Sequence, residues 1–96
     1  MPPLSPADRL APSPRVRFRE IGGEAVLLDL DRGVYFSLNE TGTAAWGGLA
    51  AGRTLGEVHA ELLARFEVEE EILWRDLEAL AGDLLDQGLL VPGAAG

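Results

Sequence analysis

Residues that could carry out catalysis are few in this sequence. The one histidine, His59, lies between Val58 and Leu62, a spacing that places it on the inner half of a helix. A catalytic histidine needs a partner group within hydrogen-bond reach, and the sequence indicates none nearby. We therefore expect His59 to be structural. Because the chain has no cysteine, disulfides, thiolate metal sites and cysteine nucleophiles are also excluded.

Two other patterns could point to a ligand. Residues 67–71 hold four glutamates, but they lack the spacing and the interleaved glycine and asparagine of a calcium loop. Acidic residues there favour the start of a helix, because they face the positive end of the helix dipole. Gly22-Gly23 and Gly47-Gly48 lack the strand-to-helix pattern of a phosphate-binding loop. We therefore expect no metal, no other cofactor and no enzymatic activity.

A surface for binding another chain is better supported. Residues 34–38 form a predicted strand without charged residues, and Asn39 follows as the N-cap of a helix. One face of this strand has Val34, Phe36 and Leu38, and the other has Tyr35 and Ser37. Proteins commonly protect a sheet edge with lysine or proline, and this strand has neither. We expect its edge to pair with another chain.

The strand at residues 34–38 is the third of a predicted antiparallel meander. Residues 15–21 alternate arginine with apolar residues, as in a half-buried strand with a charged outer face. Residues 24–30 are apolar on both faces, as in a central strand. Gly22-Gly23 and residues 31–33 supply the turns.

Three helices are predicted after the meander. Trp46 is the expected core anchor of the first, and the second starts at a capping box made by Thr54 and Glu57. The third starts within residues 67–71 and ends before Gly88. Strands followed by helices indicate an α+β fold, winged-helix-like, with the helices packed on one face of the meander.

The third predicted helix has a leucine stripe with two flanks, and one of them should border the third strand. The first flank is Trp74, Ala81 and Leu85, and the second is Ile72, Asp76, Ala79 and Asp83. A flank and the strand edge could form a groove that binds an extended peptide by strand addition. Trp74 could instead simply cap the core, and Asp76 could be an ordinary solvated carboxylate.

Length and charge limit the partners. The 96 residues suit one small domain, predicted to span residues 15–92 between a disordered proline-rich arm, residues 1–14, and a flexible tail, residues 93–96. The net charge of −8 argues against nucleic-acid binding. No apolar run is long enough for a membrane span and no signal peptide is evident, so we expect a cytoplasmic protein that does not bind membranes.

The segment Leu-Asp-Leu-Asp-Arg-Gly-Val-Tyr-Phe-Ser-Leu-Asn-Glu-Thr-Gly at residues 28–42, followed by Ala45-Trp46, resembles the PqqD-like family of peptide-binding domains, also called RiPP recognition elements. The likeness covers roughly residues 16–91. The pyrroloquinoline-quinone pathway form carries a Pro-Glu element where this chain has residues 31–35. The Gly-x-Tyr-x-x-Leu-Asn pattern is similar to that of the discrete leader-binding proteins of lasso-peptide clusters.

This resemblance implies a non-catalytic peptide chaperone, which binds the leader of a ribosomally made precursor peptide and delivers it to an enzyme. In the family, the leader adds as a strand beside the third strand and lies against the third helix. The peptide-binding residues implied here are Val34, Tyr35, Phe36, Ser37, Leu38, Ile72, Asp76, Leu77 and Leu80. A radical-SAM enzyme and a leader protease both stay open as the partner.

Two rival functions stay open from the residues alone. A winged-helix arrangement also permits nucleic-acid binding, which the acidic charge disfavours. The strand edge at residues 34–38 could instead pair with its own copy in a homodimer. We expect a monomer or a weak dimer.

Overall fold

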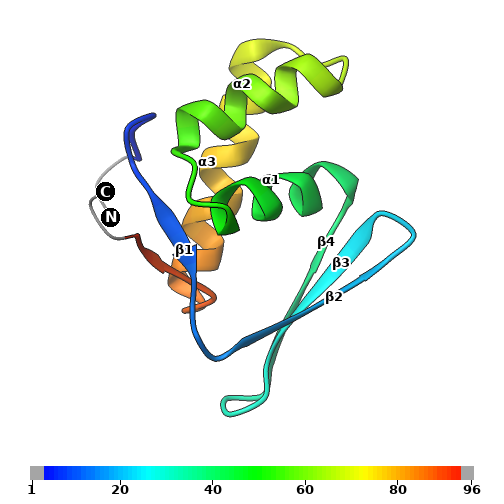
Figure 1. Cartoon of the computed structure of the whole chain (residues 1–96), viewed down its shortest axis with the longest axis vertical. Helices are drawn as coiled ribbons and strands as arrows, with labels where there is room; N and C mark the ends of the chain where they lie inside the picture. The colour runs from blue at the N-terminus through cyan, green and yellow to red at the C-terminus, as the bar shows by residue number, and fades with distance from the viewer. Residues whose placement is uncertain (1–3, 94–96) are drawn as a thin grey trace.

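The computed structural model describes residues 4–93, which form two small sheets and three helices (Figure 1). The elements in chain order are β1 (Leu10–Pro12), β2 (Val16–Ile21), β3 (Glu24–Asp29), β4 (Val34–Leu38), α1 (Glu40–Ala50), α2 (Leu55–Arg65), α3 (Glu70–Asp86) and β5 (Leu90–Pro92). The α+β fold with an antiparallel β2-β3-β4 meander followed by three helices is therefore confirmed. No helix within this part of the chain is long and apolar enough to cross a membrane.

The meander is buried on one face of β3 and β4 only. Ala25, Leu27 and Leu38 are buried against the helices, and α1 provides the contacts to both strands. β2 is more exposed than the half-buried strand we predicted, because Phe18 and Ile21 keep 44% and 83% of their surface accessible. In Figure 1 the meander extends beyond α1, so the helices cover only part of its length.

Local capping chemistry sets the helix boundaries where the sequence predicts them. Asn39 accepts a hydrogen bond from the Gly42 N–H at the start of α1, and Thr54 and Glu57 form the reciprocal capping box of α2. After α3, Gly88 has a φ of 72° and donates to Leu85, an arrangement that ends the helix. Trp46 is 5% exposed, as expected for the core anchor of α1.

The N-terminal segment differs from the sequence prediction. β1 lies within the segment that we expected to be a disordered arm, and it pairs antiparallel with β5 in the register Leu10↔Pro92 to Pro12↔Leu90. Leu10 is only 5% exposed and belongs to the core. Each strand is three residues long, and the two lie at opposite ends of the chain, so no local pattern indicates the pairing. The rest of the predicted arm and tail, residues 1–3 and 94–96, lies outside the described residues.

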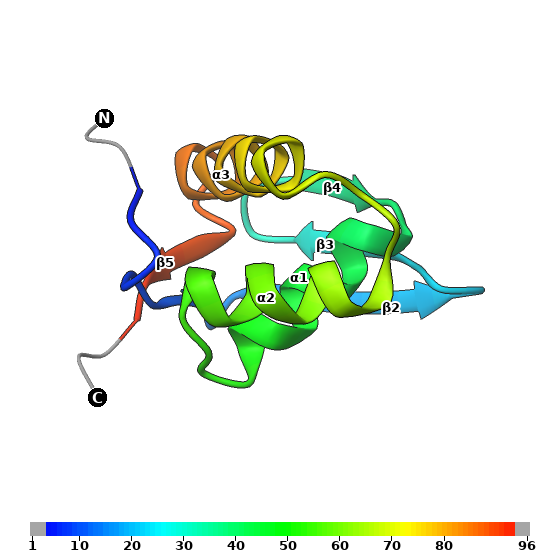
Figure 2. The same ribbon diagram turned by 90° about the horizontal axis from the view of Figure 1, so that it is seen from above.

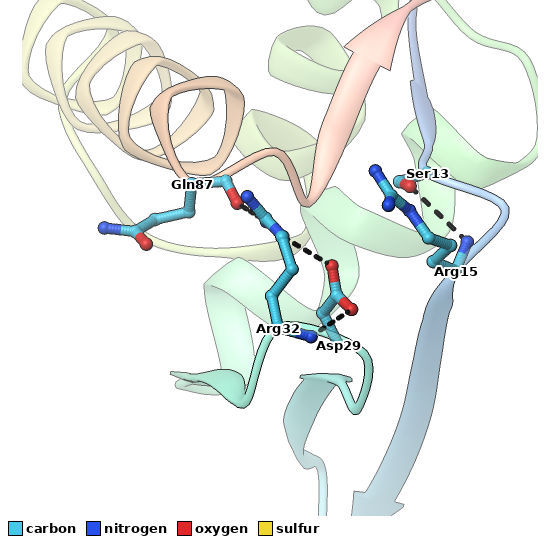
Figure 3. Close-up of polar contacts among 5 residues, drawn as sticks. All are labelled: Ser13, Arg15, Asp29, Arg32 and Gln87. Atoms are coloured by element: carbon cyan, nitrogen blue, oxygen red, sulfur yellow. Dashed lines mark hydrogen bonds and ion pairs between the residues drawn. The ribbon is translucent and has the colours of Figure 1, made fainter.

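A polar contact ties the β3–β4 turn to the end of α3 (Figure 3). The Asp29 carboxylate, whose side chain is fully buried, accepts a hydrogen bond of 2.9 Å from the Arg32 Nε. The Arg32 guanidinium also donates to the backbone oxygen of Gln87. The Arg32 hydrogen bond holds the pKa of Asp29 below its ordinary value of 3.8, although burial acts in the opposite direction.

If β1 belongs to the core, Leu10→Ala should lower the free energy of unfolding by about 2–5 kcal/mol, because it removes a buried leucine side chain. Leu30→Ala is the matched control, since Leu30 is 72% exposed and should change stability by less than about 0.5 kcal/mol. Urea unfolding followed by tryptophan fluorescence measures both. Equal stability of the two variants would mean that the N-terminal segment does not pack as described.

The Asp29 contact also predicts a pH dependence. A carboxylate with a lowered pKa in the folded state stabilises the protein above its unfolded pKa, and this contribution disappears as the pH falls through the folded value. Wild type should therefore lose its stability advantage over Asp29→Asn progressively below pH 3.8. Urea unfolding of both proteins across this range measures the difference, and a difference independent of pH would contradict the assignment.

Candidate functional site

An open groove of about 530 Å³ separates β4 from α3. In Figure 2 β4 lies close to α3. Residues from both elements line this groove. One wall is the end of β4, where Ser37 and Leu38 lie. The floor is apolar and includes Leu73 and Leu77 of α3 and Leu62 of α2. The groove therefore lies at the C-terminal end of the edge strand that the sequence predicts to be available for pairing.

β4 is an edge strand of the meander, because only β3 pairs with it within residues 4–93. The other edges contain residues that discourage pairing. Pro12 and Pro92 lie in the β1–β5 ribbon, and β2 carries Arg17 and Arg19. β4 has neither proline nor a charged residue. Its backbone is therefore the edge best suited to accept an added strand.

Six of the nine predicted peptide-binding residues line the groove. They are Ser37, Leu38, Ile72, Asp76, Leu77 and Leu80. Val34, Tyr35 and Phe36 do not line it, although they belong to the same strand. Tyr35 is 70% exposed, and Phe36 packs against the core. Of the predicted strand wall, therefore, only the last two residues line the groove.

The structure identifies which flank of α3 borders the groove. Ile72, Asp76, Ala79 and Asp83 line it, whereas no residue of the opposite flank does. Trp74, on that opposite flank, contacts the His59 ring of α2 in an edge-to-face arrangement with centroids 5.5 Å apart. The His59 Nε2 in turn lies 3.0 Å from the backbone oxygen of Glu70. Trp74 and His59 thus join α2 to α3, a contact that the sequence did not predict.

Sequence reasoning missed the residues that close one end of the groove. Asn39, Thr41 and Gly42, from the start of α1, line it together with Ala45. At Gly42 a Cβ atom would lie 3.3 Å from the Asn39 side chain, so this corner is tightly packed. The predicted N-cap at Asn39 was the available signal, because it places the first turn of α1 directly after β4.

The groove has an acidic wall and an otherwise uncharged lining. Asp76 and Asp83 are its two charged residues, and neither takes part in an ion pair among the described residues. Ser37 and Thr41 add neutral polar groups on the opposite side. Such a lining suits an extended chain with apolar side chains and a positive charge. Within residues 4–93, no cluster of histidine, aspartate and glutamate could hold a metal ion.

Two solved structures are similar to this fold over most of its length. One is TbiB1 in complex with the TbiA(beta) leader peptide, with a TM-score of 0.79 and 31% sequence identity, covering 88% of this chain and 98% of that one. The other is a lasso peptide synthetase B1 complexed with the leader peptide, with a TM-score of 0.78 and 28% identity, covering 88% and 99%. No curated protein sequence matches the chain.

A family model also matches, over residues 24–90. Its description is coenzyme PQQ synthesis protein D (PqqD). The matched span runs from the start of β3 to the start of β5, so it includes both walls of the groove and all three helices. The resemblance noted in the sequence is therefore confirmed, and the chain belongs to the PqqD family.

Proposed function

We propose that this protein is a RiPP recognition element of lasso-peptide biosynthesis, which binds the leader segment of a precursor peptide. The observation that carries the proposal is the groove between α3 and the unprotected edge of β4. The two similar solved structures support it, because each contains a bound leader peptide. These matches, at 31% and 28% identity, cover most of this chain and nearly the whole of each of the other two.

The leader binds by strand addition in this proposal. An edge strand offers a row of N–H and C=O groups that face away from its neighbour, and an extended peptide pairs with them as the next strand. Ser37 and Leu38 provide this edge inside the groove, and Leu77 and Leu80 receive apolar leader side chains from the α3 side. Val34 to Phe36 extend the same edge towards the β3–β4 turn.

Asp76 supplies electrostatic selectivity in the proposed complex. It lies on the α3 wall without an ion-pair partner among the described residues, and we assign it to a hydrogen-bond donor or a cation on the leader. A negatively charged wall also disfavours acidic leader segments. The net charge of −8 adds a long-range attraction for a basic peptide.

The protein itself has no catalytic role in this proposal. Binding the leader holds the attached core peptide close to a partner enzyme, so that its modification becomes nearly intramolecular. The similarity to lasso-peptide proteins favours a leader protease over a radical-SAM enzyme as that partner. A cytoplasmic location follows from the ribosomal origin of the substrate.

The proposal is tested by titrating the isotope-labelled protein with candidate leader peptides, with the TbiA(beta) leader as a reference. Backbone amide shifts should concentrate in β4 and along the Ile72 to Asp83 flank of α3. Shifts confined to β2, or no shift with any leader, would contradict the proposed site. Sedimentation at the same concentrations separates leader binding from self-pairing through β4.

Ser37→Pro should weaken leader binding by about tenfold, because it removes one N–H from the proposed pairing edge. Glu20→Pro places the same residue on β2, at the opposite edge of the meander, and is the matched control. Isothermal titration calorimetry measures both affinities, after circular dichroism has shown that both variants fold. Full affinity in a folded Ser37→Pro variant would exclude pairing at this N–H.

Asp76→Ala should weaken binding about two- to fivefold without unfolding the protein, the size expected for a solvent-accessible charge pair. The loss should shrink as salt is added, because exposed charges are screened. Asp86→Ala, which removes a carboxylate of α3 outside the groove lining, serves as the control. Equal affinities of the two variants would mean that Asp76 is an ordinary solvated carboxylate with no role in leader binding.

A further inference from the structure

The contact between Asp29, Arg32 and the end of α3 links the two elements that line the groove. Arg32 lies in the turn directly before β4, and the oxygen that it binds belongs to Gln87, directly after α3. The guanidinium therefore connects the start of β4 with the end of α3, the two elements that line the groove. Figure 3 shows it extended between Asp29 and Gln87.

Each part of this contact depends on the others. The Asp29 carboxylate is buried and accepts from both the Arg32 side chain and the Arg32 backbone N–H, which fixes the direction of the arginine. The carbonyl groups in the last turn of a helix lack partners within the helix and carry partial negative charge, so a cation is favourable there. Gly88 leaves room for it, because a Cβ atom at that position would lie 2.8 Å from an Arg32 nitrogen.

The main packing contacts of α3 and of β4 are with other elements. α3 packs against α2, β5 and α1, while β4 packs against β3 and α1. The groove lies between the two walls along Ser37 to Leu38 on one side and Ile72 to Asp83 on the other. A direct bridge at the Gln87 end can therefore restrict how far α3 swings or rotates relative to the strand edge.

We propose that the Asp29–Arg32 pair acts as a positioning device, which fixes the separation of α3 from β4 and thereby sets the affinity of the groove for an added strand. The link to affinity rests on the function proposed above. A strand pairs with its neighbour at about 4.8 Å, so the opposite wall must stand at one suitable distance to contact its side chains. A wall already held at that distance loses less conformational freedom when the ligand binds.

The variants separate positioning from general stability. Arg32→Gln removes the charge and the forked donor. Arg53→Gln is the matched control, because it removes a second arginine ion pair among the described residues, the one between Arg53 and Glu61. Both of these side chains are about half exposed, and neither residue lines the groove. Arg32→Lys keeps a cation beside Asp29 but lacks the planar fork that bonds two acceptors at once.

The distance between β4 and α3 is measured by electron–electron double resonance. Spin labels are attached to cysteines introduced by Tyr35→Cys and Arg75→Cys, in wild type and in each arginine variant. The chain has no cysteine of its own, and both positions are exposed. We expect a broadened or shifted distance distribution for Arg32→Gln and the wild-type distribution for Arg53→Gln. A role limited to stability would lower the melting temperature without changing this distance in the folded protein.

Leader affinity is measured by calorimetry well below the melting temperature of every variant. Arg32→Gln should bind about 3- to 30-fold more weakly, the range typical of coupling between sites. Arg53→Gln should stay within about twofold of wild type. Arg32→Lys should retain part of the affinity and part of the narrow distance distribution.

The outcomes are distinguishable. Wild-type distances and affinity in a folded Arg32→Gln variant would overturn the positioning role. If Arg32→Gln does not fold, Arg32→Lys decides in the same way, since unchanged distances and affinity in that variant would also overturn it. If wild type binds no leader, the proposed function fails, whereas the distance measurement still shows whether Arg32 sets the separation of the two walls.

Discussion

A buried carboxylate sets the strictest condition on this structure. Asp29 lies at the end of β3 with its side chain fully buried, and an unpaired charge at such a place is costly. Arg32 supplies the compensating charge from three residues further along, so the β3–β4 turn has to bring it back over the strand. The same guanidinium then reaches the end of α3. The arginine that compensates the buried charge of Asp29 thus also joins the sheet to the end of α3.

The two sides of the groove differ in charge. The arginines of β2 lie on the meander, whereas α3 begins with glutamates and carries Asp76 and Asp83 along the groove. β4 lies between these two regions and has no charged residue. A ligand in the groove therefore meets a neutral backbone edge on one side and negative charge on the other. This asymmetry favours a peptide that carries positive charge on the side facing α3.

Features specified by neighbouring residues were predictable from sequence. The Asn39 cap, the capping box at Thr54 and the Gly88 terminus each depend on a few consecutive side chains, and each lies where expected. The alternation in β4 correctly separated buried Leu38 from exposed Tyr35. Strand, helix and cap chemistry thus located β4 and α3 in the sequence, the two elements that border the groove.

Features that depend on the relative placement of elements were not predictable in the same way. The flank of α3 that borders the groove depends on the rotation of the helix about its axis, and both flanks were compatible with the leucine stripe. The exposure of Phe18 depends on where the helical layer stops. The hydrogen bond from Arg32 to the Gln87 backbone oxygen joins residues far apart in the chain, so the sequence of the β3–β4 turn does not indicate which group accepts it. β1 and β5 were missed for the same reason.

The pairing of β1 with β5 makes the two ends of the described chain interdependent. Leu10 and Leu90 are both buried at this ribbon, and Gly93 donates its N–H to the backbone oxygen of Arg9. Removal of either strand by a protease would leave the other without its hydrogen-bonding partner and expose apolar core beneath it. Trimming at one terminus therefore weakens the attachment of the opposite one, and the two ends share their resistance to degradation.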